Sequence, residues 1–256
     1  MDSDTKMPRL APATRLLDPK IFDHLKARID EDQQVRDDLT QIVQRLDRAN
    51  ALVQGLLSRV HATPRAQYAA SFLSQVEAGI QDEITAVVEL NEKASQHPYY
   101  KYNQKWNRAV QSSVFTVLLT GWLGGLGTAS KPAELGRLIT IEEVGEIFNI
   151  PVNLKDRDAF HLTIEEYLFA LIDLTQELSR LATNAVTLGN PDLSIRIAAF
   201  IKDIFAGFQV LNLKNDLLRK RVDGVKYHVQ RVEDVVYDLS LRGLVKKPEE
   251  AASVPS

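Results

Sequence analysis

The sequence predicts an all-α protein, and three observations support that fold class. Apolar residues recur at intervals of three and four, which is the period of an amphipathic helix. No stretch sustains the alternation of apolar and polar residues that strands show. The 256 residues include only 12 glycines and 10 prolines, so few positions interrupt long helices. We therefore expect a bundle of about six or seven long antiparallel helices.

Three helices are expected in the first half of the chain. Leucine, isoleucine and valine recur at helical spacing through residues 18–62, and Pro64 ends this helix because proline cannot continue it. A second helix follows Pro64 and runs to about residue 96, where His97 and Pro98 interrupt the pattern. A third is expected over residues 99–123, ending in a glycine-rich stretch.

The second half contains clear helix starts and stops. The sequence TIEE occurs at residues 140–143 and 163–166, and each copy is typical of a capping box, in which Thr and Glu satisfy free backbone amides reciprocally. The second copy opens a helix that Gly189, Asn190 and Pro191 close. Further helices are expected over residues 193–208 and 215–242, and Gly243 occupies the capping position of the second.

The chain is expected to form one domain over residues 18–243. Residues 1–17 and 244–256 are polar or contain proline, and we expect both to be disordered. The amino-terminal residues lack the apolar core of a signal peptide. The uncharged stretch over residues 109–130 contains many Ser, Thr and Gly residues, so it predicts a buried helix rather than a membrane span. The chain has no cysteine, which excludes disulfides and thiolate metal sites.

A first basic stretch indicates a local nucleic-acid surface on a chain whose net charge is -3. No acidic residue occurs between Glu92 and Glu134, and this gap contains the sequence HPYYKYNQKWNR. On one helix its cations share a face, and aromatic residues are interleaved with them, a combination typical of single-strand binding. The candidate binding residues are Lys101, Tyr102, Lys105, Trp106 and Arg108. The alternative is that the aromatic side chains are core anchors and the lysines are merely solvated.

A second basic run occupies residues 214–231 and contains Arg219, Lys220 and Arg221. These three residues are added to the candidate nucleic-acid surface, although a run of charge is usually a solvated helix face.

The same helix carries a narrow apolar stripe with steps of four and three. Such a stripe favours a coiled-coil-like contact with another helix, either within the chain or at a subunit interface. We expect it to form an oligomer interface, and its members are Leu218, Val222, Val225, Val229, Val232, Val236 and Leu239.

Two carboxylates, Asp173 and Glu177, lie one turn apart on the otherwise apolar helix that begins at residue 163. Two acids can contribute to a Mg²⁺ site for phosphodiester hydrolysis, but such sites need further ligands. The alternative is a structural polar stripe in which Arg180 pairs with the acids. The five histidines are scattered, without the spacing of a zinc site.

Three segments of the chain resemble the translin family. They are YYKYNQKW at residues 99–106, ELSRLATNAVTLG at residues 177–189, and FQVLNLKNDLLRKRVDGVKYHVQRVEDVVYDLSLRGL at residues 208–244. The last match is long and nearly unbroken, and the resemblance covers roughly residues 20–244.

The resemblance implies an all-α fold that assembles into a ring- or barrel-like octamer and binds single-stranded RNA and DNA. It also implies a hetero-octamer with translin-associated factor X, an endoribonuclease complex of RNA silencing and small-RNA processing, in the cytoplasm and nucleus. In the family the basic stretch is implicated in nucleic-acid binding. Lys101 and Lys105 keep its charge here, whereas Asn103 and Asn107 replace an expected histidine and arginine.

The catalytic subunit, factor X, has acids that match Asp173 and Glu177, together with a glutamate pair on an earlier helix. Our alignment places Ser112 and Phe115 at that pair, and neither can ligate Mg²⁺. The resemblance therefore implies a binding subunit that needs no cofactor, with Mg²⁺ used only in the complex with factor X. Two alternatives remain: the chain is itself a Mg²⁺-dependent endoribonuclease, or it is a helical scaffold that binds no nucleic acid.

Overall fold

The computed structural model describes residues 19–127 and 132–244, with side chains from residue 21 onward. The terminal segments that we expected to be disordered lie outside the described residues, except for Leu244. The chain divides into two units, residues 1–38 and 39–256. We describe each by itself, and the single domain expected over residues 18–243 stays a prediction.

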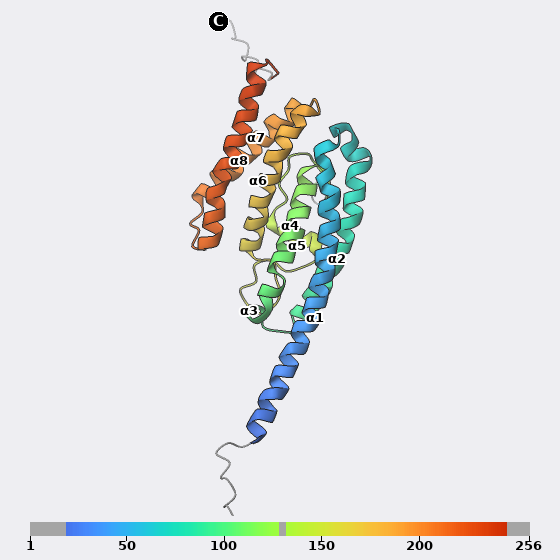
Figure 1. Cartoon of the computed structure of the whole chain (residues 1–256), viewed down its shortest axis with the longest axis vertical. Helices are drawn as coiled ribbons and strands as arrows, with labels where there is room; N and C mark the ends of the chain where they lie inside the picture. The colour runs from blue at the N-terminus through green and yellow to red at the C-terminus, as the bar shows by residue number, and fades with distance from the viewer. Residues whose placement is uncertain (1–18, 128–131, 245–256) are drawn as a thin grey trace, which may run out of the picture. The chain divides into compact units, whose positions relative to one another are not determined.

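Long helices make up most of the described chain, as predicted (Figure 1). Six of the described helices have 16 residues or more: α1 Pro19–Leu57, α2 Leu73–Ala94, α4 Asn107–Trp122, α6 Ile164–Thr187, α7 Pro191–Val210 and α8 Asp216–Leu241. Two shorter helices are α3 Tyr99–Tyr102 and α5 Ile141–Phe148. The only β pairing in the described ranges is a single bridge between Val152 and Leu162.

In the first unit, the described residues 19–38 form the beginning of α1. Side-chain bonds at a spacing of four stabilise this segment: Gln33 donates to Asp37 at 2.7 Å, and Arg36 donates to Asp32 at 2.8 Å.

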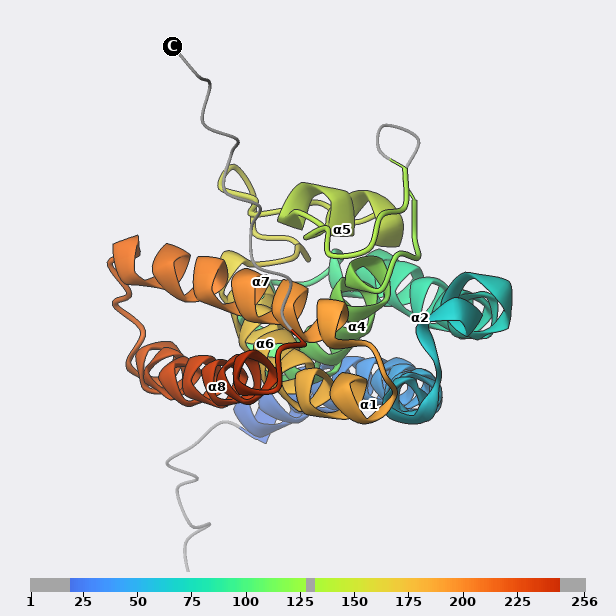
Figure 2. The ribbon, with the colours of Figure 1, turned by 90° about the horizontal axis from the view of Figure 1, so that it is seen from above.

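In the second unit, α6 is the central helix. It packs against α4, α7 and α8, and Figures 1 and 2 show α7 and α8 together on one side of it. The apolar side chains of α6, including Leu171, Leu174, Leu178 and Leu181, are buried. Because α6 is enclosed on several sides, its polar side chains also need partners within the protein.

The predicted capping boxes are confirmed. Thr140 accepts from the Glu143 amide while the Glu143 side chain accepts from the Thr140 amide, and Thr163 and Glu166 make the same exchange. The stop signals also act as expected: Gly189 has φ +73° and Gly243 has φ +66°, values that glycine adopts without steric cost.

The break at Pro64 is confirmed, but it is wider than expected. α1 ends at Leu57, and 3₁₀ turns over Ser58–Ala62 and Arg65–Gln67 are followed by a π-helical turn over Tyr68–Phe72. Regular α-helix resumes only at Leu73.

The single helix predicted over residues 99–123 is wrong. α3 ends at Tyr102, a 3₁₀ turn covers Asn103–Lys105, and α4 begins at Asn107. Asparagine side chains compete with the helical backbone for hydrogen bonds, which explains the break in a segment with two asparagines. α4 is the predicted buried helix, and no described helix is both long and apolar enough to cross a membrane.

A buried acid, Glu83, lies in the core between α2 and α4. Its side chain is fully buried, and the Thr116 hydroxyl lies 2.6 Å from its Oε2 and 2.7 Å from the Ser113 carbonyl. One hydroxyl proton serves only one of these contacts. The geometry therefore fits a protonated Glu83 that donates to Thr116, which in turn donates to Ser113. In agreement, burial raises the pKa of Glu83 to about 8.

We predict that Glu83→Gln increases the free energy of unfolding relative to the wild type, and that this increase is larger at pH 8 than at pH 5. The unfolded chain ionises Glu83 above its ordinary pKa of 4.5, whereas the folded chain keeps it protonated up to about 8, so the wild type loses stability across this interval. Gln cannot ionise and keeps a donor for Thr116. At about 1.4 kcal/mol per pKa unit, the variant gains a few kcal/mol over this range.

Urea unfolding at both pH values measures this gain. Glu92→Gln is the control, because Glu92 is an exposed acid on the same helix. A difference between Glu83→Gln and wild type that stays constant with pH contradicts the protonated state.

Candidate nucleic-acid interface

The three cations of the first basic stretch are exposed, but they do not share one helix face. Lys101 belongs to α3, Lys105 to the 3₁₀ turn and Arg108 to α4. Lys105 Nζ lies 3.4 Å from the Thr40 hydroxyl, and Lys101 Nζ lies 5.1 Å from the centroid of the Tyr102 ring. The break in the helix therefore places these charges on three consecutive elements.

The two aromatic residues predicted to contact nucleic acid are core residues instead. Tyr102 is 4% exposed and Trp106 is 1% exposed, and the Trp106 ring packs 5.5 Å from that of Phe160. A ring enclosed in this way has no free face for a base, so their predicted role as stacking platforms is wrong. Tyr100, by contrast, is 80% exposed and was not among the candidates.

The three candidate residues of the second basic run have different surroundings. Arg219 and Lys220 are exposed, and Arg219 pairs with Asp216 at 3.3 Å. Arg221 is half-buried, donates to Asp173 of α6, and lies over the Phe169 ring at 5.5 Å.

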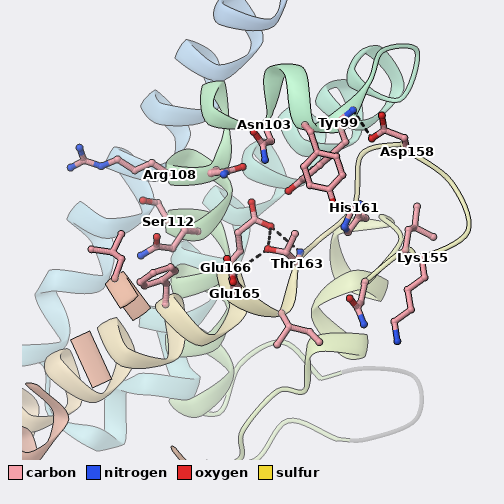
Figure 3. Close-up of a pocket in the computed structure, with 18 of the residues that line it drawn as sticks. Tyr99, Asn103, Arg108, Ser112, Lys155, Asp158, His161, Thr163, Glu165 and Glu166 are labelled. Carbon is pink, nitrogen blue, oxygen red and sulfur yellow. Dashed lines mark hydrogen bonds between the residues drawn. The ribbon is translucent and has the colours of Figure 1, made fainter. Parts of the chain in front are cut away.

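Arg108 and Arg221 both line a cleft of about 1430 Å³, and Figure 3 shows a close-up of it. α4, α6 and α8 contribute to its walls, as do α3 and the connection over residues 153–163. The connection is fixed at its base, where the Asn153 amide donates to the Leu162 carbonyl at 2.8 Å and the Leu162 amide donates to Pro151 at 2.9 Å. It adds Lys155 and Arg157, two exposed cations that the sequence analysis missed.

Two contacts hold the far part of this connection against α3. The Tyr99 amide donates to Asp158 Oδ1 at 2.9 Å, and the Tyr99 ring stacks on His161 at 4.6 Å (Figure 3). Burial is the main reason why the pKa of Tyr99 lies above its ordinary value, so this ring stays neutral.

Glu166 lies inside the cleft as part of the α6 capping box (Figure 3). Burial raises the pKa of its carboxyl to about 7, and the bonds that it accepts from Thr163 oppose this rise.

Asp173 and Glu177 are each paired with protein groups. Asp173 accepts from Arg221 of α8 and, at 2.7 Å, from Gln111 of α4. Glu177 lies 2.6 Å from His61 Nε2 and 3.6 Å from Arg180, and the hydrogen bond from His61 is the main reason why the pKa of Glu177 is lowered. The expected pairing with Arg180 therefore holds for Glu177, whereas Asp173 uses Arg221.

This pairing does not fit a Mg²⁺ site. Ser112 and Asp173 both line the cleft, but neither Ser112 nor Phe115 supplies a carboxylate. In the described part of the chain, no group of three or more His, Cys, Asp or Glu residues is arranged to hold a metal ion. A metal at Asp173 would also have to displace the Arg221 guanidinium, which already neutralises the acid.

The apolar stripe of α8 is only in part available to another subunit. Leu218, Val225, Val232 and Leu239 recur every seven residues and are buried within the chain, where α8 packs on α6 and α7. Their assignment to an oligomer interface is therefore wrong, since they fill the core of their own chain. The alternate members of the stripe, Val222, Val229 and Val236, are half-buried.

Comparison with known proteins identifies relatives that span nearly the whole chain. A model of the Translin family matches residues 34–243. Translin of Gallus gallus is 36% identical over 228 residues, which cover 89% of this chain and 94% of that protein, and Translin of Homo sapiens is 35% identical over 229 residues, or 89% and 95%. Translin-associated protein X of Mus musculus is 31% identical over 83 residues, which cover 32% of this chain and 29% of that protein.

Solved structures show the same fold at low sequence identity. The structure of apo-NeC3PO aligns with a TM-score of 0.59 at 16% identity, and covers 86% of this chain and 97% of its own. The complex of AfC3PO with duplex RNA aligns with a TM-score of 0.58 at 15% identity, and covers 88% and 99%. These alignments confirm the predicted all-α fold.

We predict that Arg221→Met lowers the free energy of unfolding by about 1–3 kcal/mol, because it leaves the half-buried Asp173 without its cation. Arg219→Met is the matched control. Its pair with Asp216 is exposed, and its loss costs less than about 1 kcal/mol. Urea unfolding measures both values.

Asp173→Asn in the Arg221→Met background tests the pairing directly. The double variant should recover most of the loss, because no unpaired charge remains. Losses that simply add show that the two side chains do not stabilise each other.

Proposed function

This chain belongs to the Translin family, and on that premise we propose that it is a single-stranded RNA- and DNA-binding subunit of an oligomer. The observation that carries the proposal is the set of exposed cations on and around the cleft of a protein whose net charge is only -3. Such charges attract phosphates locally even where the whole chain is slightly acidic. A solved protein of the same fold is described as a complex with duplex RNA, which supports RNA as a ligand.

We further propose a homo-octamer, and a hetero-octamer with translin-associated factor X that acts as an endoribonuclease in RNA silencing and small-RNA processing. The partner supplies the catalytic acids and any Mg²⁺, because Arg221 neutralises Asp173 of this chain and His61 is hydrogen-bonded to Glu177. A location in the cytoplasm and nucleus, where RNA is present, belongs to the same proposal.

Assembly strengthens binding in a simple physical way. Each chain contributes a modest basic surface, and a closed oligomer repeats it so that one strand contacts several copies. The half-buried Val222, Val229 and Val236 on α8 are the part of the apolar stripe that remains for a subunit contact.

We expect Lys101→Glu combined with Lys105→Glu to weaken binding to a fluorescent single-stranded RNA by about tenfold or more, because two attractive interactions with phosphates become repulsive. Fluorescence anisotropy over a range of salt concentrations measures the affinity. The slope of log affinity against log salt should also become shallower, by about 0.7 for each phosphate that the variant no longer neutralises.

Lys202→Glu combined with Arg242→Glu is the control for net charge, since both residues are exposed and lie outside the two basic runs. Unchanged affinity in the Lys101 and Lys105 variant shows that these lysines do not contact RNA, and no measurable binding by the wild type at low salt favours the scaffold alternative. Mg²⁺-dependent shortening of the RNA by the protein alone, abolished by Asp173→Asn, favours the ribonuclease alternative.

We expect Val229→Asp combined with Val236→Asp to reduce the mass of the assembly in light scattering and to weaken RNA binding together with it. The helical signal in circular dichroism should persist, because these side chains are not fully enclosed. Val225→Asp, a change at a fully buried position of the same stripe, should instead unfold the chain. An intact oligomer after the double change rules out this interface.

A further inference from the structure

The start of α1 presents an apolar stripe to solvent. Every residue from 21 to 31 is exposed, and the four large apolar side chains among them are between 48% and 66% exposed: Ile21, Phe22, Leu25 and Ile29. Their spacing places all four on about one third of the helix circumference. Several large apolar side chains on one exposed face are typical of a surface that contacts another molecule.

The spacing of this stripe fits a second helix. Phe22, Leu25 and Ile29 are separated by steps of three and four, which is the pattern of a helix–helix contact. Asp32 and Arg36 continue the same steps and form an ion pair at 2.8 Å. The apolar part of the stripe therefore ends at Ile29, and it covers about two turns of the helix.

The charge of the segment disfavours a membrane or a nucleic acid as the partner. Residues 21–38 contain six acidic and three basic residues, which gives a net charge of -3. A helix that lies on an anionic membrane carries mainly lysine and arginine on its polar face, and a surface that binds phosphates does the same. The partner of the stripe is therefore expected to be a protein helix.

The order of the charges makes the segment complementary to itself in one orientation. Two basic residues, Lys26 and Arg28, occur before Ile29, and two acidic residues, Asp30 and Asp32, occur after it. If two copies pair antiparallel about Ile29, Lys26 of one copy lies beside Asp32 of the other. Arg28 lies beside Asp30 in the same way. Parallel pairing in register would instead place each charge beside its own kind, which is unfavourable.

We propose that residues 21–32 of two copies of this chain pair as antiparallel helices across a two-fold axis at Ile29. Each copy contributes the same surface, so the contact is isologous and buries both stripes together. This inference rests on the proposed self-assembly and names a second contact surface in it. The surface is separate from the half-buried valines of α8.

Ile29→Asp tests the contact, because it places two carboxylates against each other on the axis. An isologous contact joins particles in pairs, so its loss should reduce the mass of the assembly in light scattering to about half. The helical signal in circular dichroism should persist, since Ile29 is exposed within its own chain. Leu52→Asp is the matched control, because Leu52 is also on α1 and is 54% exposed. It should keep the wild-type mass.

Cysteine cross-linking tests the same contact directly, because the chain has no cysteine of its own. Ile29→Cys should form a disulfide-linked dimer after mild oxidation, visible on a non-reducing gel, since the two positions meet on the axis. Leu52→Cys is the control and should remain a single chain.

Co-expression of Lys26→Cys and Asp32→Cys chains tests the orientation. Antiparallel pairing brings the two different positions together, so a mixed dimer should form. Either variant alone separates its two thiols by six residues, or about 9 Å along the axis, which is beyond the reach of a disulfide. Parallel pairing gives the opposite result, in which each variant cross-links by itself.

The outcomes separate this contact from the proposed assembly. An unchanged mass in Ile29→Asp, or no cross-link in Ile29→Cys, overturns the α1 pairing while the wild-type oligomer and its RNA binding remain. An unchanged mass together with loss of binding to phosphatidylserine vesicles assigns the stripe to a membrane instead. A wild-type protein that is monomeric in light scattering overturns the proposed assembly, and this contact with it.

Discussion

The structure depends on the need to pair polar groups on a helix that is enclosed by its neighbours. α6 packs against α4, α7 and α8, so water reaches little of its surface. Thr175 and Ser179 meet this need locally, since each hydroxyl donates to a backbone carbonyl of its own helix at 2.8 Å. Asp173 and Glu177 cannot do so, and their hydrogen-bond partners come from α4, α8 and the 3₁₀ turn after α1. These long-range pairs specify how the elements meet.

The same pairing leaves Asp173 and Glu177 poorly suited to hold a metal ion. An acid whose charge is already neutralised by a guanidinium or held by an imidazole has little affinity left for a divalent cation. The cost of freeing Asp173 is also structural, because Arg221 connects α8 to α6. A chain built in this way keeps the phosphate-attracting cations at its surface and uses its acids for stability. This division of labour suits a binding subunit that acts beside a catalytic one.

Local rules predicted much of the fold. Both TIEE motifs are capping boxes, and the glycine stops close α6 and α8 where expected, because these signals act within a few residues. The break at Asn103 and the burial of Trp106 could not be predicted in this way. Helical period and residue type are the same for a ring that faces solvent and for one that faces Phe160. His61, Gln111 and Arg221 were likewise not assigned as partners of the acids, because nothing local in the sequence marks contacts between distant helices.

The cleft shows why the site was harder to predict than the helices around it. Its connecting segment has no helical or strand period, and its shape depends on Asn153 with φ +46° and on two backbone bonds to Leu162. Asparagine is one of the few residues that adopt this left-handed conformation readily, so the segment can turn back and place Lys155 opposite Arg108. The helices provide a rigid frame with paired interior charges. The sequence of the connection can change without disturbing that frame.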